Sequence, residues 1–212
     1  MLLSMDHLVD KMGLKMEGVI HIGAHHGQEV EEYLTRGVSD ILLFEPQMGC
    51  YEILESKFKD SPEVKMVNKA LGSSDGKMVM YTETANNGQS SSLLKPVLHL
   101  QQYPHIVFNG TSEVDVTTLD EYFNDTEDVD INNYNTINID VQGYELEVFK
   151  GARESLKNID FIITEINRAE VYENCAMAED LDEFLGSQGF SRRVTTWDGM
   201  IWGDAFYTRL KK

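Results

Sequence analysis

The chain has 212 residues, of which 42% are hydrophobic and 25% are charged. This composition is typical of a globular domain with a hydrophobic core, and it excludes a disordered chain. The 36 acidic and 18 basic residues give a net charge of −18, which repels phosphate backbones and anionic lipid. We therefore expect no nucleic-acid substrate, and neutral partners such as sugars fit this charge better.

No apolar run approaches the ~20 residues that a membrane span needs. The first residues lack the basic region and the long apolar core of a secretory signal. Cys50 and Cys175 are the only cysteines, which is too few for a disulfide framework. These features predict a cytoplasmic protein with no membrane span.

Candidate strands and helices alternate along the chain. Apolar runs predict strands at 19–22, 40–45, 64–71, 136–140 and 161–165. Apolar residues at helical spacing predict helices at 28–36, 51–58, 144–149 and about 181–189. Alternating residues at 77–82 predict a further β segment, and turn residues near 198–204 predict a hairpin within 192–210.

This order of elements predicts an α/β fold with a mostly parallel, Rossmann-like sheet and helices on both faces. The C-terminal hairpin should add one antiparallel strand at or near an edge. We expect a single domain over 1–212. The polar segment 83–110 contains Pro96 and Pro104, and we expect it to be a loop that covers the active site, with a plain surface insertion as the alternative.

The turn at 23–27 (Gly-Ala-His-His-Gly) follows the first strand, at the edge of the sheet where open α/β folds bind ligands. Gly23 lets the backbone come close to a ligand, and Gly27 lets a helix begin without a side-chain clash. Glu45 ends the second strand, where an acid can accept hydrogen bonds from both ribose hydroxyls. These features predict an adenosine-containing cofactor without saying which one.

The segment 135–152 has the layout of a buried strand, an acid at the strand end, a glycine turn and a helix. Its core, Asp-Val-Gln-Gly-Tyr-Glu from Asp140 to Glu145, is followed by Gly-Ala at 151–152. With the glycine turn, Phe-Glu-Pro at 44–46, Asn-Lys-Ala-Leu-Gly at 68–72 and Thr-Leu-Asp at 118–120, it resembles the FkbM family of S-adenosylmethionine-dependent methyltransferases. The resemblance covers roughly residues 19–165.

The resemblance implies a class I methyltransferase sheet and transfer of a methyl group to a hydroxyl of a sugar or glycan, such as the deoxyhexose rhamnose. A small-molecule or glycan acceptor is the expected partner, and the chain would suit a module of a larger glycan-building enzyme. The implied contacts to S-adenosylmethionine come from the ends of the core strands and their turns: His21, Gly23, Ala24, His25, Gly27, Glu45, Pro46, Asn68, Ala70, Asp140, Val141 and Gln142.

Two positions depart from the family pattern, which often has Asp where this chain has His21 and Asn where it has His25. A neutral His21 could still form a hydrogen bond with the methionine end of the cofactor. A histidine satisfied by the strand end is the alternative. His25 and His26 are adjacent, and we expect their side chains to point apart.

A free carboxylate is too weak a base to deprotonate a sugar hydroxyl in a separate step. Either the proton leaves in concert with methyl transfer, or a divalent metal first lowers the pKa of the hydroxyl. Asp140, His25 and Glu165 are the candidate catalytic residues, and Asp140, Glu165 and Asn167 the candidate ligands of Mg²⁺ or Mn²⁺. A structural role for Asp140, bonding to the backbone of the following turn, is the alternative.

Two other functions are compatible with parts of this pattern. A nicotinamide-dependent oxidoreductase would also use Gly23, Gly27 and Glu45, although the chain lacks the Gly-x-Gly-x-x-Gly triple. A non-catalytic module that binds S-adenosylmethionine is the other. Tyr144, Trp197 and Trp202 could form a stacking wall for a sugar, or pack in the core.

Overall fold

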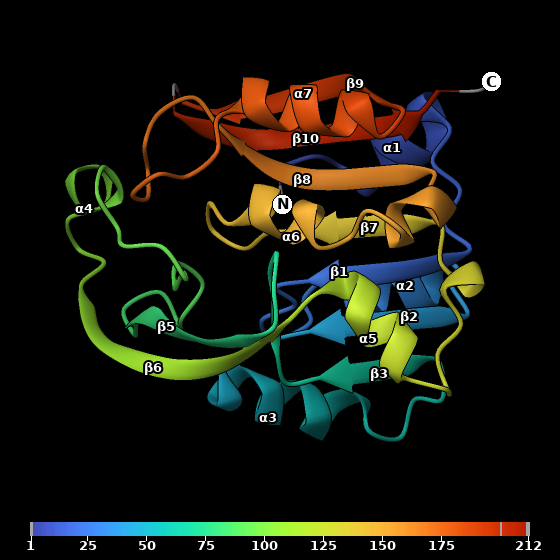
Figure 1. Cartoon of the computed structure of the whole chain (residues 1–212), viewed down its shortest axis with the longest axis horizontal. Coiled ribbons are helices and arrows are strands. Elements are labelled where there is room, and N and C mark those ends of the chain that lie inside the picture. Colours follow the sequence, from blue (N-terminus) through green and yellow to red (C-terminus); the bar gives the residue numbers. More distant parts are fainter. Residues whose placement is uncertain (1, 200, 211–212) are drawn as a thin grey trace.

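A seven-stranded sheet forms the centre of the computed structural model, which describes residues 2–199 and 201–210 (Figure 1). The strand order is β3-β2-β1-β7-β8-β10-β9. The bounds are β1 (Gly18–Ile22), β2 (Asp40–Phe44), β3 (Val64–Val67), β7 (Thr136–Ile139), β8 (Phe161–Asn167), β9 (Phe190–Asp198) and β10 (Trp202–Arg209). Only β10 runs against its neighbours, pairing antiparallel with both β8 and β9. The predicted Rossmann-like sheet with one antiparallel strand is confirmed.

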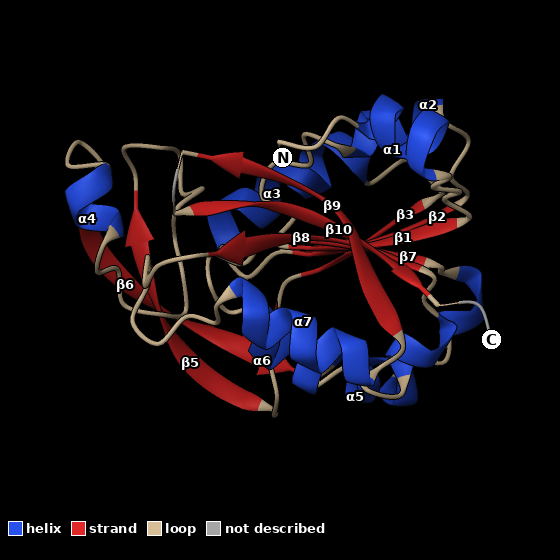
Figure 2. Cartoon of the chain, turned by 90° about the horizontal axis from the view of Figure 1, so that it is seen from above, coloured by secondary structure: helices blue, strands red, loops and turns tan. Residues whose placement is uncertain are grey.

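The sheet separates two apolar cores, and each is covered by three helices (Figure 2). One face carries α1 (Met5–Met12), α2 (Val30–Thr35) and α3 (Met48–Phe58). The other carries α5 (Leu119–Asp125), α6 (Glu145–Lys150) and α7 (Ala178–Ser187). Because successive side chains of a strand point to opposite faces, Val19 of β1 packs in the first core and Ile20 and Ile22 pack in the second.

A second, three-stranded sheet lies beside the first, in the order β4-β6-β5. It consists of β4 (Ala70–Leu71), β5 (Gly76–Glu83) and β6 (Phe108–Thr117). The single strand expected at 64–71 is therefore wrong, since β3 and β4 belong to different sheets. Asn68 lies at the break, and its side-chain amide donates to the backbone carbonyls of Glu45 and Pro46 at 2.8 and 3.1 Å. These two bonds hold the chain where it leaves the main sheet.

Several elements were not expected from the sequence. They are α1, α5, the strand β6, the short helix α4 (His99–Gln102) inside the polar segment, and the 3-10 turns at Ile131–Asn133 and Ser155–Asn158. The expected helices are present, with ends shifted by one to three residues. The expected hairpin is β9 and β10, and Met200 in its turn lies outside the described residues. Within the described ranges, every helix is too short or too polar to cross a membrane.

Candidate active site

Two cavities meet at the carboxyl ends of the central strands. The first is a narrow slot of about 50 Å³ with apolar walls from Ile22, Phe44, Leu71, Met80 and Leu93, and with Glu45 at its side. The second is wider, about 390 Å³, and mostly polar. Five residues line both cavities: Gly23, His25, Gln89, Asp140 and Gln142. The junction is therefore where two bound molecules would touch.

The turn after β1 is shaped by the close approach of β7. Gly23 has a φ of +81°, and a Cβ atom at this position would overlap the backbone oxygen of Asp140. Gly27 has a φ of +69°, and a Cβ there would clash with Leu54 and Phe58 of α3. Gly23 lets the two strand ends meet at the junction, whereas Gly27 serves the packing of α3 and lines neither cavity.

Glu45 is buried at the end of β2 and lines the first cavity. One carboxylate oxygen accepts a bond from the backbone N–H of His25 at 2.8 Å, and the other accepts one from the backbone N–H of Gln47 at 2.7 Å. Burial raises its pKa to about 7, against the pull of these two hydrogen bonds. Each oxygen keeps a second lone pair, which can accept a hydroxyl from a ligand in the slot.

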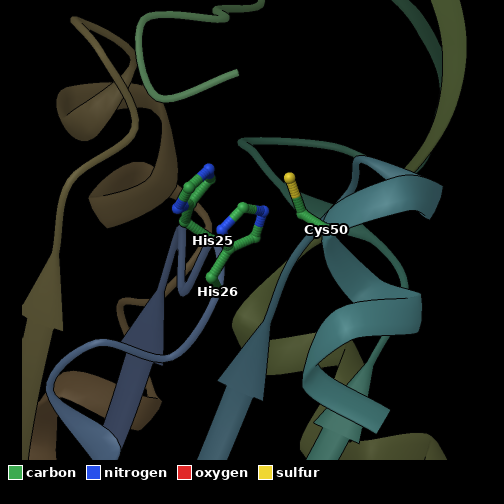
Figure 3. Close-up of side chains that lie close together, drawn as sticks. All are labelled: His25, His26 and Cys50. Atoms are coloured by element: carbon green, nitrogen blue, oxygen red, sulfur yellow. The ribbon is translucent and has the colours of Figure 1, made fainter. Parts of the chain in front are cut away.

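His25, His26 and Cys50 lie together between the glycine turn and the start of α3 (Figure 3). The two imidazole rings stack with their centres 3.7 Å apart, so the expectation that they point apart is wrong. The amide of Gln28 lies 2.9 Å from Nδ1 of His25, and Nε2 of His25 lies 2.8 Å from the carbonyl oxygen of Asn87. Both ring nitrogens of His25 are therefore engaged in hydrogen bonds within the protein, and neither is free to act as a base.

The ligand atoms of these three residues lie within 4.8 Å of one another, a spacing that would suit a transition metal. A metal bound by His25 would have to break the bond of this ring with Gln28 or with Asn87, and the Cys50 thiol, whose pKa burial raises, would have to lose its proton.

His21 points away from solvent, into a small network beneath the second cavity. Asn138 donates to the hydroxyl of Tyr33 at 2.6 Å, and that hydroxyl lies 3.3 Å from Nδ1 of His21. Burial lowers the pKa of His21, so the ring is neutral, with Nδ1 accepting from Tyr33. The ring also lines the cavity, so it combines the structural role with access to a ligand.

Three carboxyl groups gather at the junction, where Asp140, Glu145 and Glu165 lie within 4.8 Å of one another. Glu145 accepts bonds from the backbone N–H groups of Val141 and Gly143 at 3.0 and 3.1 Å. Glu145 therefore has the structural role that was the alternative for Asp140, whose carboxylate remains accessible in both cavities. Asn167 lines neither cavity, and both polar atoms of its buried side chain lack a partner among the described residues.

Gln142 connects the carboxyl groups to the opposite wall. Its amide nitrogen donates to Asp140 at 2.6 Å and to Glu165 at 3.2 Å, while its oxygen accepts from the hydroxyl of Tyr172 at 2.8 Å. Its backbone has a φ of +54°, which is uncommon for a residue other than glycine. The hydroxyl of Ser92 donates to its carbonyl oxygen at 2.7 Å, which helps to hold this conformation.

Burial sets the protonation of the acidic group. It raises the pKa of Glu165 well above the ordinary value, and the nearby charge of Asp140 raises it further. The protein around the cavity junction also raises the pKa of Asp140, although its side chain is exposed there, while its hydrogen bond from Gln142 lowers the value. Since carboxylates this close do not all ionise, and burial disfavours ionisation most at Glu165, negative charge is favoured on Asp140.

The polar segment 83–110 lies over both cavities. Gly88, Gln89, Ser91 and Leu93 line the first, and Asn86, Gln89, Ser90, His99, Tyr103 and Ile106 line the second. Two hydrogen bonds connect this segment to residues that line the first cavity. One joins His25 to the carbonyl of Asn87, and in the other the side-chain amide of Gln47 donates to the carbonyl of Gly88 at 3.1 Å.

The three aromatic residues expected to form one wall are separated. Tyr144 lines the first cavity and Trp202 the second. The indole nitrogen of Trp202 donates to the hydroxyl of Tyr103 at 3.0 Å, which connects the covering segment to β10. Trp197 lines neither cavity, and the guanidinium of Arg168 lies 3.6 Å from its ring centre. Trp202 and Tyr103 are therefore the aromatic pair that faces the wider cavity.

Most of the expected cofactor residues line one cavity or both. They are His21, Gly23, Ala24, His25, Glu45, Pro46, Ala70, Asp140, Val141 and Gln142. Gly27 and Asn68 act on the turns behind them. Two residues of the site were not predicted: Tyr172, which no local motif marks, and Glu145, although it is part of the 140–152 signature.

Known proteins that resemble this chain are methyltransferases. The family model described as the methyltransferase FkbM domain matches residues 21–192. The chain belongs to the FkbM methyltransferase family. A curated relative, the 2-O-methyltransferase NoeI of Sinorhizobium fredii, is 24% identical over 163 residues. That match covers 73% of this chain and 65% of NoeI, so the chain matches just under two thirds of the length of that relative.

Solved structures show the same fold at low identity. A proposed S-adenosylmethionine-dependent methyltransferase of Listeria monocytogenes aligns with a TM-score of 0.55 at 11% identity, covering 97% of this chain and 98% of the other. A proposed tRNA methyltransferase of Streptococcus pneumoniae aligns with a TM-score of 0.54 at 11% identity, covering 99% and 71%. These likenesses establish the Rossmann-like methyltransferase fold of this FkbM protein.

Proposed function

We propose that this FkbM protein is an S-adenosylmethionine-dependent O-methyltransferase that acts on a hydroxyl of a sugar or glycan, a deoxyhexose such as rhamnose among them. The observation that carries the proposal is the junction of the two cavities at Asp140. A methyl donor in the first cavity and an acceptor in the second would meet beside an accessible carboxylate. The name of NoeI, a 2-O-methyltransferase, supports oxygen as the acceptor atom.

The first cavity fits the adenosine part of the cofactor by its chemistry. Glu45 offers free lone pairs to ribose hydroxyls, and the apolar walls suit an adenine ring. Gly23 lets the ends of β1 and β7 approach each other beside this cavity. The slot is narrower than an adenosine, so binding must move the covering strip Gly88–Leu93. Membership of a methyltransferase family favours this cofactor over the nicotinamide cofactor that Glu45 would also suit.

When bound, S-adenosylmethionine supplies a methyl group that is already activated. The protein must then align the acceptor and remove its proton. Asp140 is the accessible carboxyl at the junction, and its raised pKa makes it more basic than a free aspartate. Gln142 holds Asp140 by one N–H bond and Glu165 by the other. With the cofactor bound, Asp140 would accept the proton of the acceptor hydroxyl as the hydroxyl oxygen takes the methyl group.

Oxygen ligands at the junction are of the type that Mg²⁺ or Mn²⁺ prefers. One oxygen of each carboxyl is already hydrogen-bonded, since Gln142 donates to Asp140 and to Glu165 and one oxygen of Glu145 accepts two backbone bonds. A divalent ion held by Asp140 and Glu165 would compete with these bonds, and it would lower the pKa of the acceptor hydroxyl. Proton transfer to Asp140 does not require such an ion.

Calorimetric titration of S-adenosylmethionine, and of its demethylated product, into the purified protein tests the cofactor, with and without EDTA. Micromolar binding that EDTA leaves unchanged is the expected result, and methyl transfer to a panel of sugars then identifies the acceptor. Absence of binding would overturn the proposal. Binding without methylation of any acceptor would identify a non-catalytic module that binds the cofactor.

A further inference from the structure

The wider cavity is lined by acidic groups and, within the described part of the chain, by neither lysine nor arginine. Its carboxyl groups are those of Glu29, Asp140, Glu165, Asp198 and Asp204. They come from segments far apart in the sequence, the turn before α2, the ends of β7, β8 and β9, and β10. The acidic lining is thus a property of the assembled cavity and not of one acidic stretch.

Some of these acids are compensated by the protein, and others are not. Burial disfavours the ionised form of Glu165, and Asp204 accepts bonds from the backbone N–H groups of Leu2 and Leu3. Glu29, which is half-buried, and Asp198, which is exposed, form no ion pair with any described residue. A cavity concentrates the field of such groups, so the space between these two acids and Asp140 is negative, with more solvent screening at Asp198 than at Glu29.

A second observation indicates that a polar ligand belongs in this cavity. His99 lines it with only 4% of its surface exposed, and its Nδ1 atom has no hydrogen-bond partner among the described residues. Burial lowers the pKa of His99, so the ring is neutral and does not offset the acids. Unpaired buried polar atoms are costly, and a hydroxylated ligand could satisfy this one.

We propose that this cavity selects its acceptor by charge, favouring a hydroxyl compound that carries a protonated amine and excluding carboxylated or phosphorylated ones. The proposal rests on the proposed methyl transfer and specifies its substrate class. A protonated amine has no lone pair, so it would pair with Glu29 or Asp198 while the hydroxyl remains the group that is methylated. An anionic group would face uncompensated carboxylates with no cation to receive it.

Four acceptors that share the glucose ring and differ in charge test this selection. They are methyl glucosaminide, which is cationic, methyl glucoside, which is neutral, and methyl glucuronide and glucose 6-phosphate, which are anionic. We expect the amine to bind at least ~10-fold more tightly than the neutral glycoside, and the two anions at least ~10-fold more weakly, since one close charge pair is worth at least about one factor of ten. Binding is measured by ligand-observed NMR with the demethylated cofactor present, and kcat/KM is measured where turnover occurs.

The double variant Glu29→Gln, Asp198→Asn should compress this order toward equal binding. The matched control is Glu127→Gln, which removes an exposed charge from the segment before β7, at the opposite edge of the sheet. Equal binding of the four sugars, binding by none of them, or an order that the double variant leaves unchanged would overturn the charge selection. Failure of S-adenosylmethionine to bind would instead overturn the proposed function, whatever order the sugars show.

Discussion

Glu145 should make the stability of the protein depend on pH. Its side chain is 1% exposed, and burial raises its pKa from an ordinary 4.5 to about 7. A carboxyl whose pKa is raised by folding contributes fully below the unfolded pKa, and that contribution is lost as pH rises through the folded pKa. For pKa values of 4.5 in the unfolded and about 7 in the folded state, this loss of stability is about 1 kcal/mol at pH 5 and about 3 kcal/mol at pH 8.

The variant Glu145→Gln removes this cost, because its amide oxygen can still accept the N–H bonds from Val141 and Gly143. Relative to the wild type, its free energy of unfolding should therefore improve by about 2 kcal/mol between pH 5 and pH 8. Urea unfolding followed by circular dichroism at the two pH values measures the difference.

The matched control is Glu147→Gln, two residues further along α6, where the carboxylate pairs with Lys150 at the surface. That variant should show little change with pH, since exposed pairs contribute less than about 1 kcal/mol. A Glu145→Gln effect that is the same at both pH values would refute the reasoning, because it would mean that Glu145 ionises without penalty.

Three further changes test the site. Asp140→Asn should lower methyl transfer at least ~10²-fold while S-adenosylmethionine affinity by calorimetry stays within a few fold, and normal turnover would exclude Asp140 as the base. Gly23→Ala should abolish cofactor binding and lower the melting temperature, whereas Gly37→Ala, which has a φ of +79° but meets no neighbouring atom, should cost only its backbone strain. His25→Ala removes the hydrogen bond to the carbonyl of Asn87 in the covering segment 83–110. Since one hydrogen bond contributes about 1 kcal/mol, cofactor dissociation in stopped-flow experiments should become about fivefold faster. An unchanged rate would show that this bond does not hold the covering segment closed.

The sequence predicted the parts of this fold that depend on local pattern. Runs such as the one in β2 are apolar because both faces of the strand are buried, and parallel order then places Glu45 and Asp140 at the same edge. The second sheet could not be predicted in this way. β6 is largely exposed and polar, with Val114 and Val116 among its few buried residues, so it carries no run that marks a strand.

The covering segment shows the same limit. Its length and polarity predicted a position over the site, but its contacts depend on pairs far apart in the chain. His25 and Asn87 are 62 residues apart, and Tyr103 and Trp202 are 99 apart. The stacking of His25 on His26 could not be predicted from the sequence either, because the positive φ of His25, 47°, comes from the turn and not from the residue type.

The acidic group shows how the fold assigns different roles to similar residues. Burial disfavours the anionic forms of Glu145 and Glu165, so negative charge is favoured on Asp140, which is exposed to the cavities. Glu165 was an equal candidate for the base from sequence, yet burial disfavours the ionised form that a base needs. Its use is to share the amide of Gln142 and keep that side chain against Asp140. Replacing Glu165 by Gln should therefore slow methyl transfer far less than Asp140→Asn does, and equal losses in the two variants would show that the proton is shared between them.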